Sequence, residues 1–286
     1  MPRRLAILFA ATAVLAMVAC SPRPSPITPP GPVPTTAPPI AQPDGTFDVG
    51  GYSLYLHCQG SGSPTILYFH GWDNEHDSAS SRSAASLPAL LRDRYRFCAY
   101  DRPNVGASDS TPGLVTGAEQ VRALHALLGA AGVDGPYLLL GASFGGLVAY
   151  DYLMNYPEGI QAMLLLDADF PDEVEYEHYF ATENQLANRD WSTSEEKTNQ
   201  YDVFTQAYAM RGAEPDIPMA YLAATPNLKW QRGVPGYDTN IVTAQVKFVA
   251  AFPRGVLENV PSPQYMEAAV PGVIVDHIDA LVAQIP

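Results

Sequence analysis

A serine between glycines is the residue of this chain best suited to nucleophilic chemistry. Ser143 is the centre of Gly-Ala-Ser-Phe-Gly at 141–145, which follows an apolar run at 137–140 and precedes a helix-like run at 147–154. Strand, G-x-S-x-G and helix in that order are typical of a nucleophile elbow, a sharp turn that strains the serine and exposes its oxygen. The pattern predicts that the Ser143 hydroxyl projects from the carboxyl end of a strand. The alternative is an ordinary strand-to-helix turn that carries a serine.

The segments around Ser143 alternate between strand and helix patterns, so a sheet is expected to position it. Residues 65–69 form a continuous apolar run, as in the middle of a parallel sheet. Residues 117–131 carry apolar side chains on one helical face. Further strands are expected within 44–58 and at 95–100, 162–166, 217–223 and 257–260, and further helices at 81–93, 239–251 and 270–283. This alternation predicts a parallel sheet with helices on both faces.

Composition indicates one large globular domain and argues against nucleic acid as a partner. The chain has 286 residues, 47% of them hydrophobic, and a formal net charge of -14. A charge of that sign repels a polyphosphate backbone. No His, Cys and carboxylate cluster has the spacing of metal ligands, so neither a metal nor an organic cofactor is expected.

The N-terminus is expected to be an export signal followed by a lipid anchor. Residues 1–19 combine a cationic start with an apolar stretch too short to be a stable transmembrane anchor. The sequence Met17-Val18-Ala19-Cys20 resembles the lipobox of bacterial lipoproteins, although leucine is usual where Met17 stands. The resemblance implies that Cys20 becomes the acylated first residue (a palmitate-bearing lipoprotein) on the outer face of the cell membrane. A plain secretory signal, with a secreted product, is the alternative.

Residues 20–43 are expected to tether this anchor to the domain. Ten prolines fall between 22 and 43, a density that neither helix nor sheet tolerates. The composition favours an extended polyproline tether; the alternative is a proline-rich ligand for a partner. The folded domain is then expected at 44–286.

Three motifs resemble the α/β-hydrolase superfamily, and the resemblance covers about residues 44–286. They are the elbow at 141–146, His70-Gly71-Trp72 after the predicted strand at 65–69, and the segment 100–108, similar to the family's D-R-x-G-x-G-x-S. Asn104 replaces a glycine in the last motif, and asparagine tolerates the left-handed conformation. The resemblance implies a mostly parallel sheet of about eight strands, helices on both faces and a small helical lid at roughly 171–212.

The resemblance also implies particular backbone and cysteine roles. An oxyanion hole would be formed by the N–H groups of Phe144 and Trp72, and His70 would be structural. In the family's sheet the second and fourth strands are neighbours, which predicts a disulfide between Cys58 and Cys98; two unpaired cysteines are the alternative.

The triad acid has three candidates, in the family's chain order of serine, acid and histidine. Asp167 directly follows the strand predicted at 162–166 and is preferred; it could instead be a structural acid. Asp238 and Asp169 are the alternatives, because the usual position after the next strand holds no carboxylate.

The general base is harder to place. The family's histidine position holds Gln264, and glutamine cannot accept a proton near neutral pH. His277 is the one histidine that follows all three candidate acids and is named as the base, although its expected helix also suits a surface role. His76 and His178 are the alternatives.

The sequence is therefore consistent with two functions. The first is an exported serine hydrolase, esterase-like, that cleaves a small-molecule carboxylic ester by acyl transfer through Ser143. The second is a catalytically silent member whose pocket serves as a binding module at the cell surface. Aromatic residues of the expected lid suit an apolar acyl or alcohol group, or simply pack the lid onto the core.

Overall fold

The computed structural model describes residues 42–72, 79, 86–176, 196–226 and 237–285. The chain divides into two compact units, Met1–Pro39 and Ile40–Pro286, and every described residue lies in the second. The expected signal segment, Cys20 and nearly all of the tether therefore lie outside the described residues. Among the helices that the structure describes, none is both long and apolar enough to cross a bilayer.

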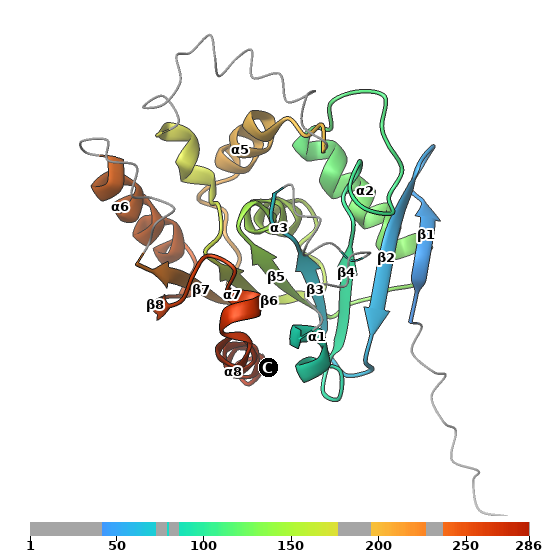
Figure 1. The fold of residues 1–286 in the computed structure, drawn as a ribbon. Helices are drawn as coiled ribbons and strands as arrows, with labels where there is room; N and C mark the ends of the chain where they lie inside the picture. The colour runs from blue at the N-terminus through green and yellow to red at the C-terminus, as the bar shows by residue number, and fades with distance from the viewer. Residues whose placement is uncertain (1–41, 73–78, 80–85, 177–195, 227–236, 286) are drawn as a thin grey trace, which may run out of the picture. The chain divides into compact units, whose positions relative to one another are not determined.

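One eight-stranded sheet forms the centre of the described unit, in the order β1-β2-β4-β3-β5-β6-β7-β8 (Figure 1). β1 pairs antiparallel with β2, and β2 pairs antiparallel with β4, whereas the remaining neighbours are parallel. The strands are β1 Asp44–Asp48, β2 Ser53–Gln59, β3 Thr65–Phe69, β4 Arg96–Tyr100, β5 Tyr137–Ala142, β6 Ile160–Leu166, β7 Pro218–Thr225 and β8 Arg254–Pro261. This arrangement confirms the predicted fold class.

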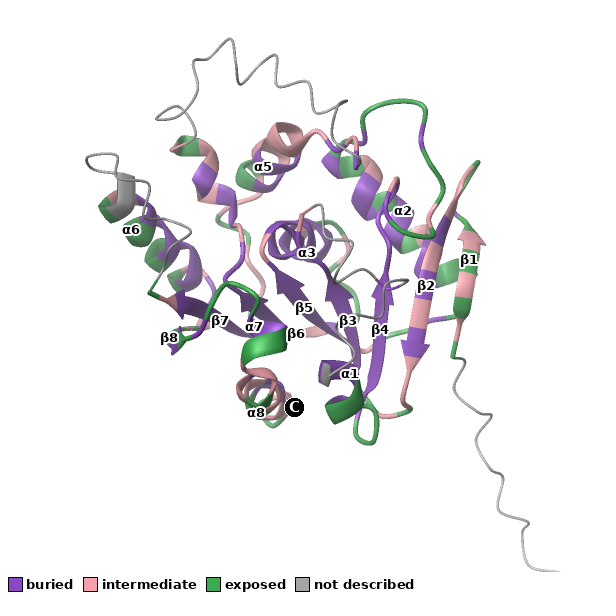
Figure 2. Cartoon of the chain, viewed as in Figure 1, coloured by how far each residue is buried: buried purple, intermediate pink, exposed green. Residues whose placement is uncertain are grey.

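Burial on both faces explains why the sequences of the central strands are continuous apolar runs. Every residue of β3, β4 and β5 is buried, because both faces of the sheet are covered there (Figure 2). β2 alternates between intermediate and buried positions, as a strand with one covered face does.

Helices cover the sheet in two layers. α2 Gly117–Ala130, α3 Phe144–Asn155, α5 Gln200–Ala209 and α6 Tyr237–Ala250 share one core cluster with sheet residues such as Leu67 and Leu139. α1 Ser86–Leu91, α7 Met266–Ala269 and α8 Pro271–Val282 share the other cluster with Ile66 and Leu138. Alternate side chains of one strand therefore pack against opposite helix layers. This is the coverage of both sheet faces that the sequence predicts.

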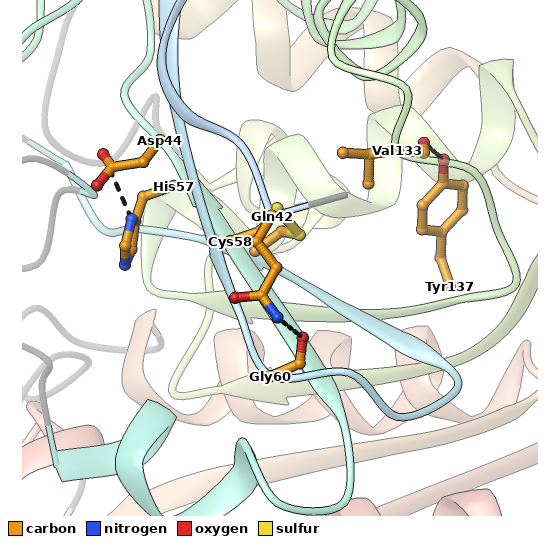
Figure 3. The surroundings of a disulfide bond; sticks show 8 residues. Gln42, Asp44, His57, Cys58, Gly60, Val133 and Tyr137 are labelled. Carbon is orange, nitrogen blue, oxygen red and sulfur yellow. Dashed lines mark hydrogen bonds and ion pairs between the residues drawn. A yellow bond between two sulfur atoms is a disulfide. The ribbon is translucent and has the colours of Figure 1, made fainter. Parts of the chain in front are cut away.

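The predicted disulfide is present. Cys58 in β2 lies directly opposite Cys98 in β4, and the two are bonded across a sequence separation of 40 (Figure 3). Cys58 is 3% exposed and Cys98 is fully buried, so the bond lies inside the core.

The region expected to be a lid contains two short helices among its described residues. It contains the 3₁₀ helix η1 Pro171–Glu175 and α5, which contacts η1, α2 and α3; residues 177–195 lie outside the described part. Phe204 of α5 is buried in the core, and the Tyr208 hydroxyl donates to Glu175. Phe204 therefore packs α5 onto the domain, whereas the Tyr208–Glu175 bond joins α5 to η1 within the region, and the role of the region as a lid stays a prediction.

Candidate active site

Ser143 occupies a strained turn between β5 and α3. Its φ of 48° and ψ of -127° are rarely adopted by a residue with a side chain. The Ser143 N–H donates to Leu166 O at 3.1 Å, and the Ser143 carbonyl accepts from the N–H groups of Gly146 and Asp169 at 2.9 Å each. The surrounding backbone thus fixes the turn, and the half-buried side chain lies at the carboxyl end of β5.

The glycines after the serine allow this turn to approach its neighbours. A Cβ atom on Gly145 would lie 2.2 Å from Phe69 O and 2.4 Å from His70 O, and one on Gly146 would lie 2.3 Å from Ala168 Cβ. Any larger residue at 145 would therefore push α3 away from the loop that follows β3.

The two expected oxyanion donors lie at the same end of the sheet as Ser143. Phe144 is the first residue of α3, and a first-turn N–H has no acceptor within its own helix. Trp72 follows His70 and Gly71 in the loop after β3, and its ring meets the Phe144 ring edge to face at a centroid distance of 5.2 Å. The side chains of the two candidate donors therefore pack directly against each other.

A pocket of about 180 Å³ opens over the Ser143 side chain. The described residues that line it come from the loop after β3, the elbow, the loop after β8 and α7: Gly71, Trp72, Ala142, Ser143, Gln264, Tyr265 and Glu267. Gln264 Nε2 donates a long hydrogen bond of 3.4 Å to Ser143 Oγ. An amide can orient the hydroxyl in this way, but it cannot remove its proton near neutral pH.

Glu267 is the carboxylate in this pocket, and the sequence analysis did not identify it. The residue belongs to α7, is 4% exposed and accepts a hydrogen bond of 2.8 Å from the buried Tyr68 hydroxyl of β3. Its position three residues after Gln264 was the only available sequence signal, since the contact with β3 spans 199 residues of chain.

The candidate acids differ in where they lie. Asp167 directly follows β6 with a φ of 41°, is 2% exposed and accepts from the Ala224 N–H at 3.2 Å. Asp169 contacts the elbow through its backbone, and neither residue is among those lining the pocket. Asp238 is in the first turn of α6, and its side chain lies outside the described part.

The structure does not bring His277 to Ser143. His277 lies on α8, with Nδ1 2.8 Å from Val273 O and Nε2 2.9 Å from a Glu258 carboxylate oxygen. This geometry gives His277 the surface role that its helix suggested and leaves the base assignment without support. The alternatives His76 and His178 lie outside the described residues.

The remaining described histidines do not line the pocket either. His70 is fully buried, and its pKa is lowered well below the usual value by burial and by the nearby Arg102 charge. A neutral imidazole whose Nδ1 lies 2.9 Å from Gly71 O suits the structural role expected for it. Within the described ranges, no three His, Cys, Asp or Glu side chains gather in a way that could hold a metal ion.

Solved structures of the same fold resemble the described unit over most of its length. A putative alpha/beta hydrolase from Nostoc (TM-score 0.62, 14% identity) covers 85% of this chain and 98% of its own. Mouse alpha/beta hydrolase domain-containing protein 10 has a TM-score of 0.59 and 16% identity, and the match covers 82% of this chain and 95% of the mouse chain. An esterase from Exiguobacterium antarcticum has a TM-score of 0.54 and 15% identity, and the match covers 82% of this chain and 99% of the esterase. At these identities the likeness establishes the fold alone.

Sequence relatives match a shorter stretch. The uncharacterized protein YqjL of Bacillus subtilis is 30% identical over 128 residues, and an uncharacterized vacuolar membrane protein of Saccharomyces cerevisiae is 32% identical over 134. The matches cover 44% and 41% of this chain, but only 49% and 20% of those proteins.

A family model described as the alpha/beta hydrolase fold matches residues 64–212, which include the loop after β3, the elbow and α5. With the strand order and the serine turn described above, the chain therefore belongs to the α/β-hydrolase fold family.

Proposed function

We propose that the protein is an exported serine hydrolase that cleaves a carboxylic ester by acyl transfer through Ser143. Family membership supports a hydrolase in general. The observation that carries the serine mechanism is the strained Ser143 backbone, with a φ of 48° at the junction of β5 and α3. Strain of this kind is retained where it aims a functional group. Export is proposed from the signal-like residues 1–19.

The reaction begins with attack of Ser143 Oγ on the ester carbonyl carbon. The carbonyl oxygen becomes negative, and the N–H groups of Phe144 and Trp72 stabilise it. The tetrahedral intermediate then collapses, the alcohol leaves with a proton, and water hydrolyses the acyl-serine by the same steps.

We assign proton transfer to Glu267, since it is the carboxylate that shares the described pocket with Ser143. Glu267 accepts the serine proton, directly or through one water molecule, and returns it to the departing alcohol. Gln264 orients the hydroxyl for this transfer through its bond to Oγ.

The pocket volume favours a short substrate. About 180 Å³ is well below the roughly 300–1,000 Å³ of sites for drug-sized ligands. We expect esters with a short acyl chain to be preferred, and a panel of esters of increasing chain length measures this directly.

A second candidate is a binding module without catalysis. The observation that favours it is the Gln264–Ser143 hydrogen bond, because an amide occupies the position beside the nucleophile. In that case the pocket would bind a small molecule and leave it intact.

Labelling with a fluorophosphonate separates the two candidates. The full chain and Ser143→Ala are treated with the probe, which phosphonylates activated serines. Labelling that disappears in Ser143→Ala supports the hydrolase. A wild-type protein that stays unlabelled, while it still binds small esters, supports the binding module.

A further inference from the structure

We propose that Arg102 is a positioning residue that aligns both donors of the oxyanion hole. The inference rests on the proposed function, because it assigns a purpose to the Trp72 and Phe144 N–H groups. Arg102 lies in the D-R-x-G-like segment, and its side chain is fully buried.

The first contact fixes the Trp72 donor. Arg102 Nη1 donates to His70 O at 2.6 Å, and Nη2 donates to Gly71 O at 2.7 Å. The Gly71 carbonyl and the Trp72 N–H belong to one planar peptide unit, whose trans geometry points them in opposite directions. Holding the Gly71 oxygen therefore fixes the direction of the Trp72 N–H.

The second contact positions the residue that carries the other donor, Phe144. The Arg102 guanidinium carbon lies 5.3 Å from the centroid of the Phe144 ring, within the range of a cation–π interaction. The Phe144 ring also meets the Trp72 ring, so one guanidinium contacts the loop of one donor and the side chain of the other. This shared contact holds the spacing between the two N–H groups.

Glu196 holds the guanidinium in place from the other side. Its two carboxylate oxygens accept from Arg102 Nη2 at 2.7 Å and Nε at 2.9 Å, and its side chain is 1% exposed. The Glu196 carbonyl accepts from Asn104 Nδ2 at 2.9 Å, which anchors the backbone there. A planar fork of donors is needed to bind a carboxylate and two carbonyls at once, and the ammonium of lysine lacks it.

Arg102→Lys tests the proposal because it keeps the charge and removes the fork. A displacement of about 1 Å in a catalytic group, or loss of one oxyanion donor, costs about 100-fold in rate. We therefore expect the second-order rate of Ser143 phosphonylation, per folded molecule of the full chain, to fall about 100-fold. Glu196→Gln keeps one acceptor and removes the charge, so a smaller fall is expected.

Arg211→Lys is the matched control. Arg211 also pairs with carboxylates, through Nε to Asp172 at 2.7 Å and through Nη1 to Glu214, and its guanidinium carbon lies 5.2 Å from the Phe248 centroid. Among the described residues, its hydrogen bonds, ion pairs and ring contact involve Asp172, Glu214 and Phe248 and not the loop after β3. Arg211→Lys is therefore expected to affect stability and to leave the labelling rate per folded molecule unchanged.

Amide hydrogen exchange at Trp72 and Phe144, followed by NMR in the same variants, gives a readout that is independent of activity. Faster exchange at both amides in Arg102→Lys than in Arg211→Lys supports the proposal. Equal exchange, or equal labelling rates in the two variants, overturns it. If wild-type Ser143 is never labelled, the proposed function fails, and the exchange measurement still decides the role of Arg102.

Discussion

At the scale of single residues, the Ser143 hydroxyl meets an amide where its chemistry needs a base. Since the oxygen accepts from Gln264 Nε2, the hydroxyl hydrogen is directed to another acceptor. Glu267 lines the same pocket, which is why we assign the proton to it. Two substitutions examine this arrangement.

Gln264→His is expected to increase ester hydrolysis. An imidazole beside Ser143 Oγ accepts protons near neutral pH, and a positioned general base contributes about 10²–10⁴-fold in rate. Steady-state hydrolysis of a short ester measures the gain. The double variant Ser143→Ala, Gln264→His is the control, and a gain that persists in it would show that the added activity does not pass through the serine.

Glu267→Gln is expected to lower the rate of Ser143 phosphonylation by at least about 10²-fold, because the amide cannot accept the proton. The Gln carbonyl still accepts from the Tyr68 hydroxyl, so the fold is preserved. Glu173→Gln is the control, since Glu173 is also buried but accepts from the Phe170 N–H instead. Equal labelling of the two variants would remove Glu267 from the mechanism.

At the scale of elements, the contact between α3 and α5 carries a buried carboxylate. Asp151 of α3 is fully buried, and burial raises its pKa to about 7; Asp202 adds to the rise, while hydrogen bonds from Gln206 and Asn155 oppose it. The Gln206 amide of α5 donates to both Asp151 oxygens, at 3.1 and 3.2 Å. The contact between α3 and α5 therefore encloses a carboxyl group that holds its proton to higher pH than an exposed aspartate does.

This arrangement predicts that stability falls as pH rises from about 4 to about 7. The folded state holds the Asp151 proton above the ordinary pKa of 3.8, so ionisation is penalised only in the folded state, by an amount on the order of a few kcal/mol. Urea unfolding at pH 5 and pH 8 should show a smaller loss in Asp151→Asn than in the wild type. Asp93 has a side chain that is 91% exposed, so Asp93→Asn serves as the control. Between pH 5 and pH 8 this variant should lose as much stability as the wild type.

At the scale of the whole molecule, much of the architecture could be predicted from the sequence. Buried strands such as β3 and β5 are continuous apolar runs, and the Cys58–Cys98 pair followed from the order of the family's strands. The left-handed turn expected at Asn104 is present, with a φ of 67°.

The chemistry of the site was harder to predict, because it depends on contacts between distant segments. Glu267 reaches β3 only through tertiary packing, and Arg102 meets a carboxylate 94 residues away. His277 is near the right place in the sequence, but on a helix where Glu258 and Val273 hold its ring. Periodicity predicts which elements form and does not show which side chains meet.

The export signal and lipid anchor belong to the whole chain and stay predictions. If Cys20 is acylated, bacterial cells fed labelled palmitate should incorporate it into the wild type and not into Cys20→Ser, and the wild type should sediment with membranes. Incorporation that is unchanged in Cys20→Ser would place the lipid elsewhere, and none in either protein would favour plain secretion.

The pairing of β2 with β4 has a mechanical consequence. A pull on the chain at Pro43 would first peel β1 from β2, because Asp44 to Asp48 pair with His57 to Ser53 in an antiparallel ladder. The load would then run along β2 and stop at Cys58, whose covalent bond passes it to β4 in the sheet interior. The segment enclosed by that cross-link, which contains β3 and the Trp72 that follows it, would be shielded from tension until the sulfur bond is reduced.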